Sequence, residues 1–154
     1  MIQRIQSIFI LIAAILLVTI IIWPIDFFSN AQGLIELHWD GVYDVTPEVA
    51  EPLIRSLVPL AVVIAIALAL NVVALFLFKR RTIQMRLVGV AAGIEVCVVA
   101  VLVYLGVNIA DGMNVEWHVC ARWALPLIAA IMDFLAYGRI SDDEALVRSL
   151  DRLR

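Results

Sequence analysis

The chain has 154 residues, a length that suits one domain. Hydrophobic residues make up 64% of the sequence and charged residues 16%, and the mean hydropathy is +1.04. This composition is far more apolar than that of globular proteins and excludes an ordinary soluble domain. The net charge of −3 is less informative than the positions of the charges, and nucleic-acid binding is not expected.

Four stretches are long and apolar enough to cross a membrane. A hydrocarbon layer about 30 Å thick requires roughly 20 mostly apolar residues in a helix. The sequence therefore predicts a single integral membrane domain over residues 1–154, an all-α bundle of four transmembrane helices. The expected spans are Ile5–Trp23, Leu53–Phe78, Leu87–Ile109 and Trp117–Gly138.

The basic residues predict the orientation of the chain in the lipid bilayer. All but Arg55 and Arg122 of the 11 Lys and Arg residues lie in three places: Arg4, the run 79–86 and the tail 139–154. An even number of spans puts these places on one side, and the positive-inside rule makes that side cytoplasmic. We therefore expect a multi-pass protein of the bacterial inner membrane with both termini in the cytoplasm, its first span being an uncleaved anchor.

Alternating apolar residues in the loop after the first span predict a small outer β-hairpin between the first two helices. Two registers are open. A two-residue turn at Asp40-Gly41 would pair Trp39 with Val42. A three-residue loop 39–41, with Gly41 in a left-handed bulge position, is the register we favour. It would put four apolar side chains on one face of the hairpin: Ile35, Leu37, Tyr43 and Val45.

Prolines and capping residues predict where the helices begin, end and bend. Pro24 should end or kink the first helix. The tripeptide 46–48 (Thr-Pro-Glu) predicts that the second helix begins outside the bilayer, with an N-cap, a proline and an acid in its first turn. We expect Pro59 to kink that helix, Asn114 to cap the fourth helix and Pro126 to kink it.

The residues after Gly138 predict a short amphipathic cytoplasmic helix. Ser141 and Glu144 have the spacing of a capping box, and Glu144 with Arg148 forms an (i, i+4) pair of opposite charge. Apolar residues recur on another face of this helix: Leu146, Val147, Leu150 and Leu153.

Three motifs at the start, middle and end of the chain carry a family resemblance. They are Met1-Ile2-Gln3-Arg4-Ile5-Gln6, then Phe78-Lys79-Arg80-Arg81 followed by Gln84-Met85-Arg86-Leu87, and finally Asp143-Glu144-Ala145-Leu146-Val147-Arg148-Ser149 with Asp151-Arg152-Leu153-Arg154. On these motifs the whole chain resembles an uncharacterised bacterial four-helix inner-membrane family, the domain of unknown function 4293 family. The resemblance implies a topology, but no activity, cofactor or catalytic residue.

Three polar residues, Asn71, Glu95 and Asp133, fall inside the predicted spans. At about 1.5 Å per residue they lie roughly 12, 13 and 9 Å from the nearest cytoplasmic basic residues, so they share one half of the membrane. A carboxylate there costs at least roughly 2.5–3.5 kcal/mol and must face the bundle interior or water. We expect an interhelical hydrogen-bond cluster; the alternative is a proton- or ion-linked site.

Gly89, Gly93 and Cys97 form a stripe of small residues on the predicted third helix. Glu95 lies roughly 155° around the helix from the centre of this stripe, so both can hardly face the same interior. If Glu95 faces inward, the stripe is free to contact a second copy or another membrane protein. The alternative is a central third helix that is covered on both sides. Cys97 and Cys120 are expected at different depths and unbridged.

Two further groups of residues are candidates for binding. One group is a basic face on the cytoplasmic side. Its charges can be explained by their effect on the orientation of the chain in the membrane, and the alternative is that they bind anionic lipid headgroups. This face consists of Lys79, Arg80, Arg81 and Arg86. His38, Glu116 and His118 lie on the outer side and are weak candidates for metal ligands, because they lack the spacing of a known metal motif. We predict no metal and no cofactor.

The sequence has no phosphate-binding loop, dinucleotide fingerprint or nucleophile elbow, so a non-enzymatic protein is expected. We expect a structural or accessory subunit whose shared role lies on the cytoplasmic face around Arg80, Arg81 and Arg86. The alternative is a small proton-coupled transporter or channel component that uses Glu95 and Asp133. A cavity open to water at these acids would favour the alternative, whereas a dry contact would disfavour it.

Overall fold

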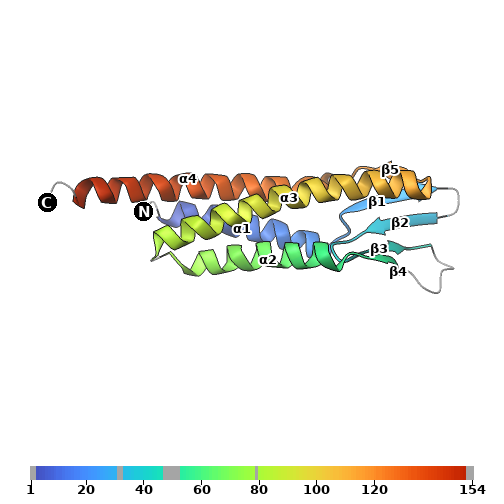
Figure 1. Ribbon diagram of the computed structural model, residues 1–154, viewed down its shortest axis with the longest axis horizontal. Helices are drawn as coiled ribbons and strands as arrows, with labels where there is room; N and C mark the ends of the chain where they lie inside the picture. The colour runs from blue at the N-terminus through green and yellow to red at the C-terminus, as the bar shows by residue number, and fades with distance from the viewer. Residues whose placement is uncertain (1–2, 31–32, 47–52, 79, 152–154) are drawn as a thin grey trace.

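The protein is a bundle of long helices with a small β-sheet at one end (Figure 1). The computed structural model describes residues 3–30, 33–46, 53–78 and 80–151. The helices are α1 (Gln3–Ile22), α2 (Val58–Phe76), α3 (Arg81–Met113) and α4 (Leu125–Asp151). We call the end that carries the sheet the sheet end. The opposite end, where α1 begins and α4 finishes, is called the far end.

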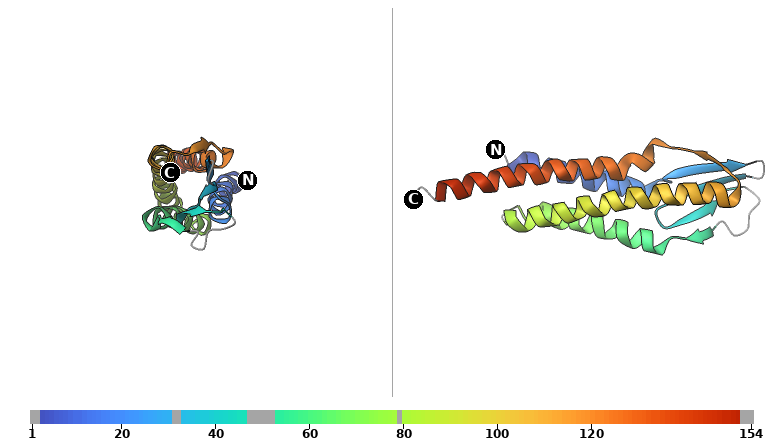
Figure 2. Two further views of the ribbon diagram at one scale, coloured as in Figure 1. Left: turned by 90° about the vertical axis from the view of Figure 1, so that its right-hand side faces the viewer. Right: turned by 45° about the horizontal axis from the view of Figure 1, so that its top comes forward.

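The four helices stand around a common axis, as the end-on view shows (Figure 2). Each helix packs against the helix before and after it in the sequence, and α4 closes the ring by packing against α1. The interior is filled mainly by aliphatic side chains and alanines at three- and four-residue spacing, which keeps them on one face of each helix. On α2, for example, Leu60, Ile64, Ala67 and Ala74 are buried.

All four helices are long and apolar enough to cross a membrane. Only 28–33% of each span is buried within the chain. The remaining surface carries large exposed apolar side chains such as Ile15, Val62 and Phe134. A helix that is apolar on its outward face as well as its inward face is adapted to hydrocarbon surroundings. The predicted number of long apolar helices is confirmed.

The second helix begins later than the sequence suggested. Residues Leu53–Ser56 form a strand, β4, and α2 starts at Val58. Pro59 lies in the first turn of α2, where a missing N–H leaves no helical bond unmade, so it marks the start of the helix and not a kink in its middle. Of the predicted capping residues, positions 47 and 48 lie outside the described residues.

The connection between the third and fourth helices also differs from the prediction. Helix α3 continues to Met113, and Asn114 caps its carboxyl end in the left-handed conformation (φ 50°, ψ 49°). Asparagine is one of the few residues that adopt this conformation readily, so it ends α3 and does not cap the fourth helix. A short 3₁₀ helix (Ala121–Ala124) precedes α4. Pro126 is the second residue of α4 and lies in its first turn, not at a kink.

The predicted separate tail helix is wrong, because α4 runs without interruption through Gly138 to Asp151. Ser141 is therefore in the middle of a helix, where it cannot act as an N-cap. Of the predicted apolar face, Leu146 is exposed, and the side chains of Val147, Leu150 and Leu153 lie outside the described residues. Pro24 follows the end of α1 at Ile22, as predicted.

The sheet is larger than the predicted hairpin. Its strands are β1 (Asp26–Asn30), β2 (Gly33–Leu37), β3 (Gly41–Asp44), β4 (Leu53–Ser56) and β5 (Glu116–His118). Their order is β4-β3-β2-β1-β5, and neighbouring strands are antiparallel. Because β5 comes from the connection between α3 and α4, the sheet joins both connections at the sheet end.

The hairpin of β2 and β3 exists, but neither predicted register is correct. Leu37 pairs with Val42, and His38 donates its backbone N–H to the Gly41 carbonyl oxygen. The turn therefore has Trp39 and Asp40 as its central residues, and Gly41 has no positive φ. The physical reason is burial: Ile35, Leu37 and Val42 face the core together, and Trp39 packs against the same core.

Candidate functional site: a polar cluster inside the helix bundle

Three polar side chains meet in the interior of the bundle: Asn71 of α2, Glu95 of α3 and Asp133 of α4. Each has 0% of its surface exposed. The Asn71 amide donates a hydrogen bond from Nδ2 to Glu95 Oε1 over 2.9 Å. The same amide also lies beside the Asp133 carboxyl, and Asp133 is close enough to Glu95 for electrostatic interaction. The structure thus brings together the three residues singled out in the sequence.

Helical periodicity explains why these polar residues point inward. Asn71 lies four residues after Ala67 and three before Ala74, and both alanines have no exposed surface. Alanines also flank the acids: Ala91 and Ala92 precede Glu95 by one turn, and Ala129, Ala130 and Ala136 lie one turn from Asp133. Small residues let helix backbones approach closely within a membrane. The polar groups are therefore enclosed by tightly approaching helices.

Most oxygen atoms of this cluster lack a hydrogen-bond partner among the described residues. They are Asn71 Oδ1, Glu95 Oε2 and both carboxyl oxygens of Asp133. A buried polar atom left without a partner costs about 1–3 kcal/mol, and more if it is charged. The cluster is thus rich in acceptors and poor in donors, which is the arrangement that binds a proton or another cation.

Two further polar contacts between helices lie toward the far end, and sequence reasoning did not predict them. The Gln6 amide of α1 donates to Asp143 Oδ2 over 2.5 Å and to the Arg139 carbonyl oxygen over 3.2 Å, both on α4. The Gln84 amide of α3 donates to the carbonyl oxygen of Ala74 on α2 over 3.1 Å. Gln6 and Gln84 are each buried in the structure. In the sequence, each is only a single glutamine near the start of a helix, which does not identify its partner.

The small-residue stripe of α3 is divided between two environments. Gly93 is exposed, and a Cβ added to it would meet nothing within 4 Å. Cys97 is exposed as well. A Cβ on Gly89 would instead lie 3.4 Å from the ring of Tyr137 on α4. Glu95 faces the interior, so Gly93 and Cys97 face outward, while Gly89 serves packing between α3 and α4.

The predicted basic face lies at the connection between α2 and α3, at the far end of the bundle. Arg80 and Arg86 are exposed and Arg81 is half-buried, whereas Lys79 lies outside the described residues. Nearby, the Thr82 hydroxyl of α3 contacts Glu144 Oε1 of α4 over 3.4 Å.

The weak metal candidates have separate partners on the sheet. His38 Nε2 lies 3.0 Å from Glu36 Oε2, and His118 Nε2 lies 2.6 Å from the Ser29 hydroxyl. Glu116 is exposed on β5. Within the described residues, no group of three His, Cys, Asp or Glu side chains is placed to hold a metal ion.

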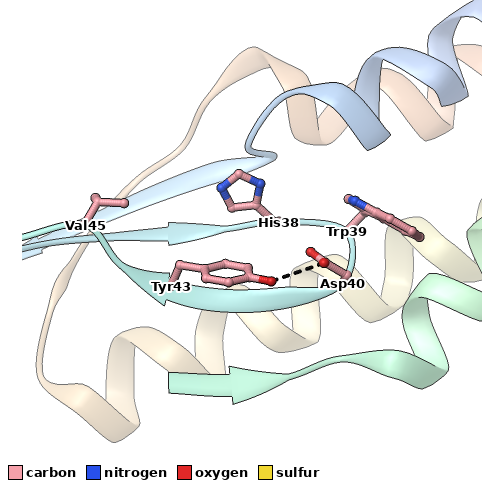
Figure 3. A pocket seen from close by; sticks show the side chains of 5 residues that line it. All are labelled: His38, Trp39, Asp40, Tyr43 and Val45. Atoms are coloured by element: carbon pink, nitrogen blue, oxygen red, sulfur yellow. Dashed lines mark hydrogen bonds between the residues drawn. The ribbon is translucent and has the colours of Figure 1, made fainter. Parts of the chain in front are cut away.

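A shallow hollow lies beside the turn of the hairpin (Figure 3). It has a volume of about 300 Å³ and is lined by His38, Trp39, Asp40, Tyr43 and Val45. The Tyr43 hydroxyl donates to Asp40 Oδ2 over 3.1 Å, and the His38 ring stands edge-on to the Tyr43 ring at 5.2 Å. Burial and this bond to Asp40 raise the pKa of Tyr43.

Asp26 of β1 links the first connection to the second and was missed by sequence reasoning. Its carboxylate accepts from the Trp117 indole N–H over 2.5 Å and from the Cys120 backbone N–H over 2.7 Å. Asp26 is buried, and the Trp117 ring stacks on Phe28 at 6.2 Å. A Cβ on Gly106 of α3 would come within 2.6 Å of the same indole ring. The sequence showed only an acid after a proline.

The fold defines a class of protein: a bundle of four helices, each long and apolar enough to cross a membrane, with an antiparallel sheet at one end. A family model described as a domain of unknown function, DUF4293, matches residues 2–153. The chain therefore belongs to the DUF4293 family, as its three motifs suggested. A comparison with curated proteins finds no match.

Proposed function

We infer that this protein is a non-enzymatic subunit of the bacterial inner membrane with a structural or accessory role, contacting another membrane protein or a second copy of itself. In this proposal the far end faces the cytoplasm and the sheet lies outside. The positions of the basic residues support that orientation, because Arg80 and Arg86 lie at the connection between α2 and α3 or in the first turns of α3, and Arg139 lies beside Gln6 near the start of α1.

The observation that carries the proposal is the outward face of α3. Gly93 and Cys97 are exposed on the side of the helix opposite the buried Glu95, and Ala100 continues this exposed strip. A glycine in a helix costs about 1 kcal/mol relative to alanine, and lipid makes no contact that offsets this cost. A second helix does, since small residues permit close backbone approach. A second copy of α3 is the simplest such helix.

Cross-linking through Cys97 tests this contact. In a Cys120→Ser background, Cys97 is the remaining cysteine, so oxidation of native membranes should yield a disulfide-linked dimer. Gly93→Leu should reduce that product strongly, because its side chain would hold the helices apart. Gly112→Leu is a matched control, since Gly112 is also an open position on α3 with nothing within 4 Å of an added Cβ. Monomer alone from every variant would contradict a contact between copies.

The unpartnered oxygens of the polar cluster favour a second candidate function, a small proton-coupled transporter or channel component that uses Glu95 and Asp133. The burial of all three side chains disfavours it, because transport requires access to water. Purified protein in liposomes containing a pH-sensitive dye distinguishes the two. A proton flux that is lost in Glu95→Gln would support transport, and no flux above empty liposomes would leave the accessory role.

A further inference from the structure

We propose that Asn71, Glu95 and Asp133 form a binding site for a proton, so that the folded protein in the membrane carries a protonated carboxyl group in this cluster at neutral pH. The proposal is independent of the accessory role and of any contact through α3. It also requires no transport, since a site can hold a proton without moving it across the bilayer.

The first support for the proposal is that the cluster has more hydrogen-bond acceptors than donors. Among the described residues, the Asn71 amide is the donor to this cluster, and four oxygen atoms are left without partners. A proton on a carboxyl oxygen turns that oxygen into a donor. A protonated Asp133, for example, could donate to Asn71 Oδ1 or to Glu95, and so supply partners to two of the four atoms.

The second support is that, in the part of the chain that the structure describes, no basic side chain lies near the two acids to balance their charge. Neither α2 nor the described side chains of α1 contain an ionisable group. The nearest basic residues along α3 and α4 are Arg86 and Arg139, and both are exposed, as is Cys97. The Tyr137 ring packs on the Gly89 side of α3. No described basic residue therefore forms an ion pair with either acid, and two bare carboxylates side by side in hydrocarbon would be strongly unfavourable.

The packing around the site favours a proton over a metal ion. A hard cation such as Mg²⁺ or Ca²⁺ takes about six or more oxygen ligands, whereas these three side chains together offer five oxygen atoms. The site has no exposed surface through which water could complete the shell. A proton requires neither added volume nor a coordination shell, and the buried alanines around the cluster keep the helices close.

Infrared spectroscopy of the whole protein in liposomes at neutral pH tests the proposal. The wild type should show the C=O stretch of a protonated carboxylic acid, and this band should shift in D₂O. The double variant Glu95→Gln/Asp133→Asn should lose the band completely, because amides keep the shape of the side chains but carry no acid. The matched control Asp111→Asn changes an exposed acid of α3 and should leave the band intact.

Three outcomes would overturn the proposal. One is a wild-type spectrum with ionised carboxylate bands alone, which can be read even if the double variant fails to fold. Another is a protonated band that survives in the double variant. The last is a melting temperature that rises with added Na⁺ or Ca²⁺ in the wild type but not in the double variant, since this would assign the cluster to a metal cation.

Discussion

Gly106 of α3 lies directly beneath the indole of Trp117. Ring atoms of Trp117 would be 2.6–3.0 Å from an added Cβ, so no side chain fits there without movement. The indole is also held by the hydrogen bond of its N–H to Asp26 and by stacking on Phe28. The position of β5 against the helices therefore depends on the absence of a single methyl group.

Replacement of this glycine by alanine should destabilise the sheet end. Gly106→Ala would displace the Trp117 ring and weaken its bond to Asp26, at a cost of roughly 1–3 kcal/mol for overpacking. Thermal unfolding in detergent measures the change in stability, and the tryptophan emission of the protein reports the displacement of the ring. Gly112→Ala provides the control, since an added Cβ meets nothing within 4 Å there. Equal stability changes in both variants would contradict the steric explanation.

Cys120 is the second residue with a local environment that can be tested. The backbone N–H and the guanidinium of Arg122 lower the pKa of its thiol, and Arg122 Nε lies 3.2 Å from Sγ. The thiolate is the reactive form of cysteine, so a lower pKa extends the reactivity of Cys120 toward lower pH.

In a Cys97→Ser background, Arg122→Gln should remove the guanidinium contribution and shift the pH profile of alkylation by iodoacetamide upward. The backbone N–H remains in this variant, so the shift should be partial. Arg55→Gln, which changes the exposed arginine of β4, should leave the profile unchanged. A profile that does not respond to Arg122→Gln would exclude a role for the guanidinium.

At the level of elements, long apolar stretches were predictable and short strands were not. The helices follow from runs of apolar residues that span the hydrocarbon thickness, and the hairpin follows from alternation around Asp40. Strand β4 was assigned to a helix because Leu53 and Ile54 continue an apolar pattern, and β5 is too short to show any alternation. Strand β4 forms by pairing with β3 of the same connection, and β5 forms by pairing with β1 of the other connection, which local sequence does not encode.

The candidate site was predictable for a related reason. A polar residue in an apolar span must face the interior, so Asn71, Glu95 and Asp133 could be identified before their helices were placed. The hairpin register could not be identified, because a two-residue turn at Asp40-Gly41 and a three-residue loop 39–41 were both plausible. The observed register is a third one, in which Trp39 packs on the core. Asp26 had no such signal, since its partners lie more than 90 residues away.

The continuity of α4 predicts whether replacement of Gly138 by alanine raises or lowers the stability of the protein. Gly138 lies inside the helix, and a Cβ added there meets nothing within 4 Å. Gly138→Ala should therefore stabilise the protein by up to about 1 kcal/mol through helix propensity. If Gly138 instead ended one helix before a separate tail, alanine would be strained and the variant would be less stable. The change in melting temperature in detergent decides between the two.

At the scale of the whole molecule, the helices form a closed ring with the sheet at one end and both termini at the other (Figure 1). This arrangement makes the proposed orientation testable with few probes. Cys120 marks the sheet end, and Asp142 on the last part of α4 marks the far end.

In intact bacteria, an impermeant maleimide should label Cys120 in a Cys97→Ser variant. It should label Asp142→Cys, in a chain without other cysteines, only after the membrane is permeabilised. Reversal of charge by Arg80→Glu with Arg81→Glu should produce mixed labelling, because the basic run helps to fix the orientation. Labelling of both sites from outside, without the charge reversal, would contradict the proposed orientation.

The pairing of β5 with β1 also has a consequence for the order in which the protein is made. During synthesis, the first connection emerges and can form β4-β3-β2-β1 long before residues 116–118 exist. In the proposed orientation, β1 is an edge strand with unpaired N–H and C=O groups until α3 has inserted and the second connection has been translocated. A nascent chain that stalls after α3 therefore exposes a strand edge that the complete chain hides. The last pairing of the sheet therefore marks the point at which α1, α2 and α3 have been made and the chain is about to begin α4.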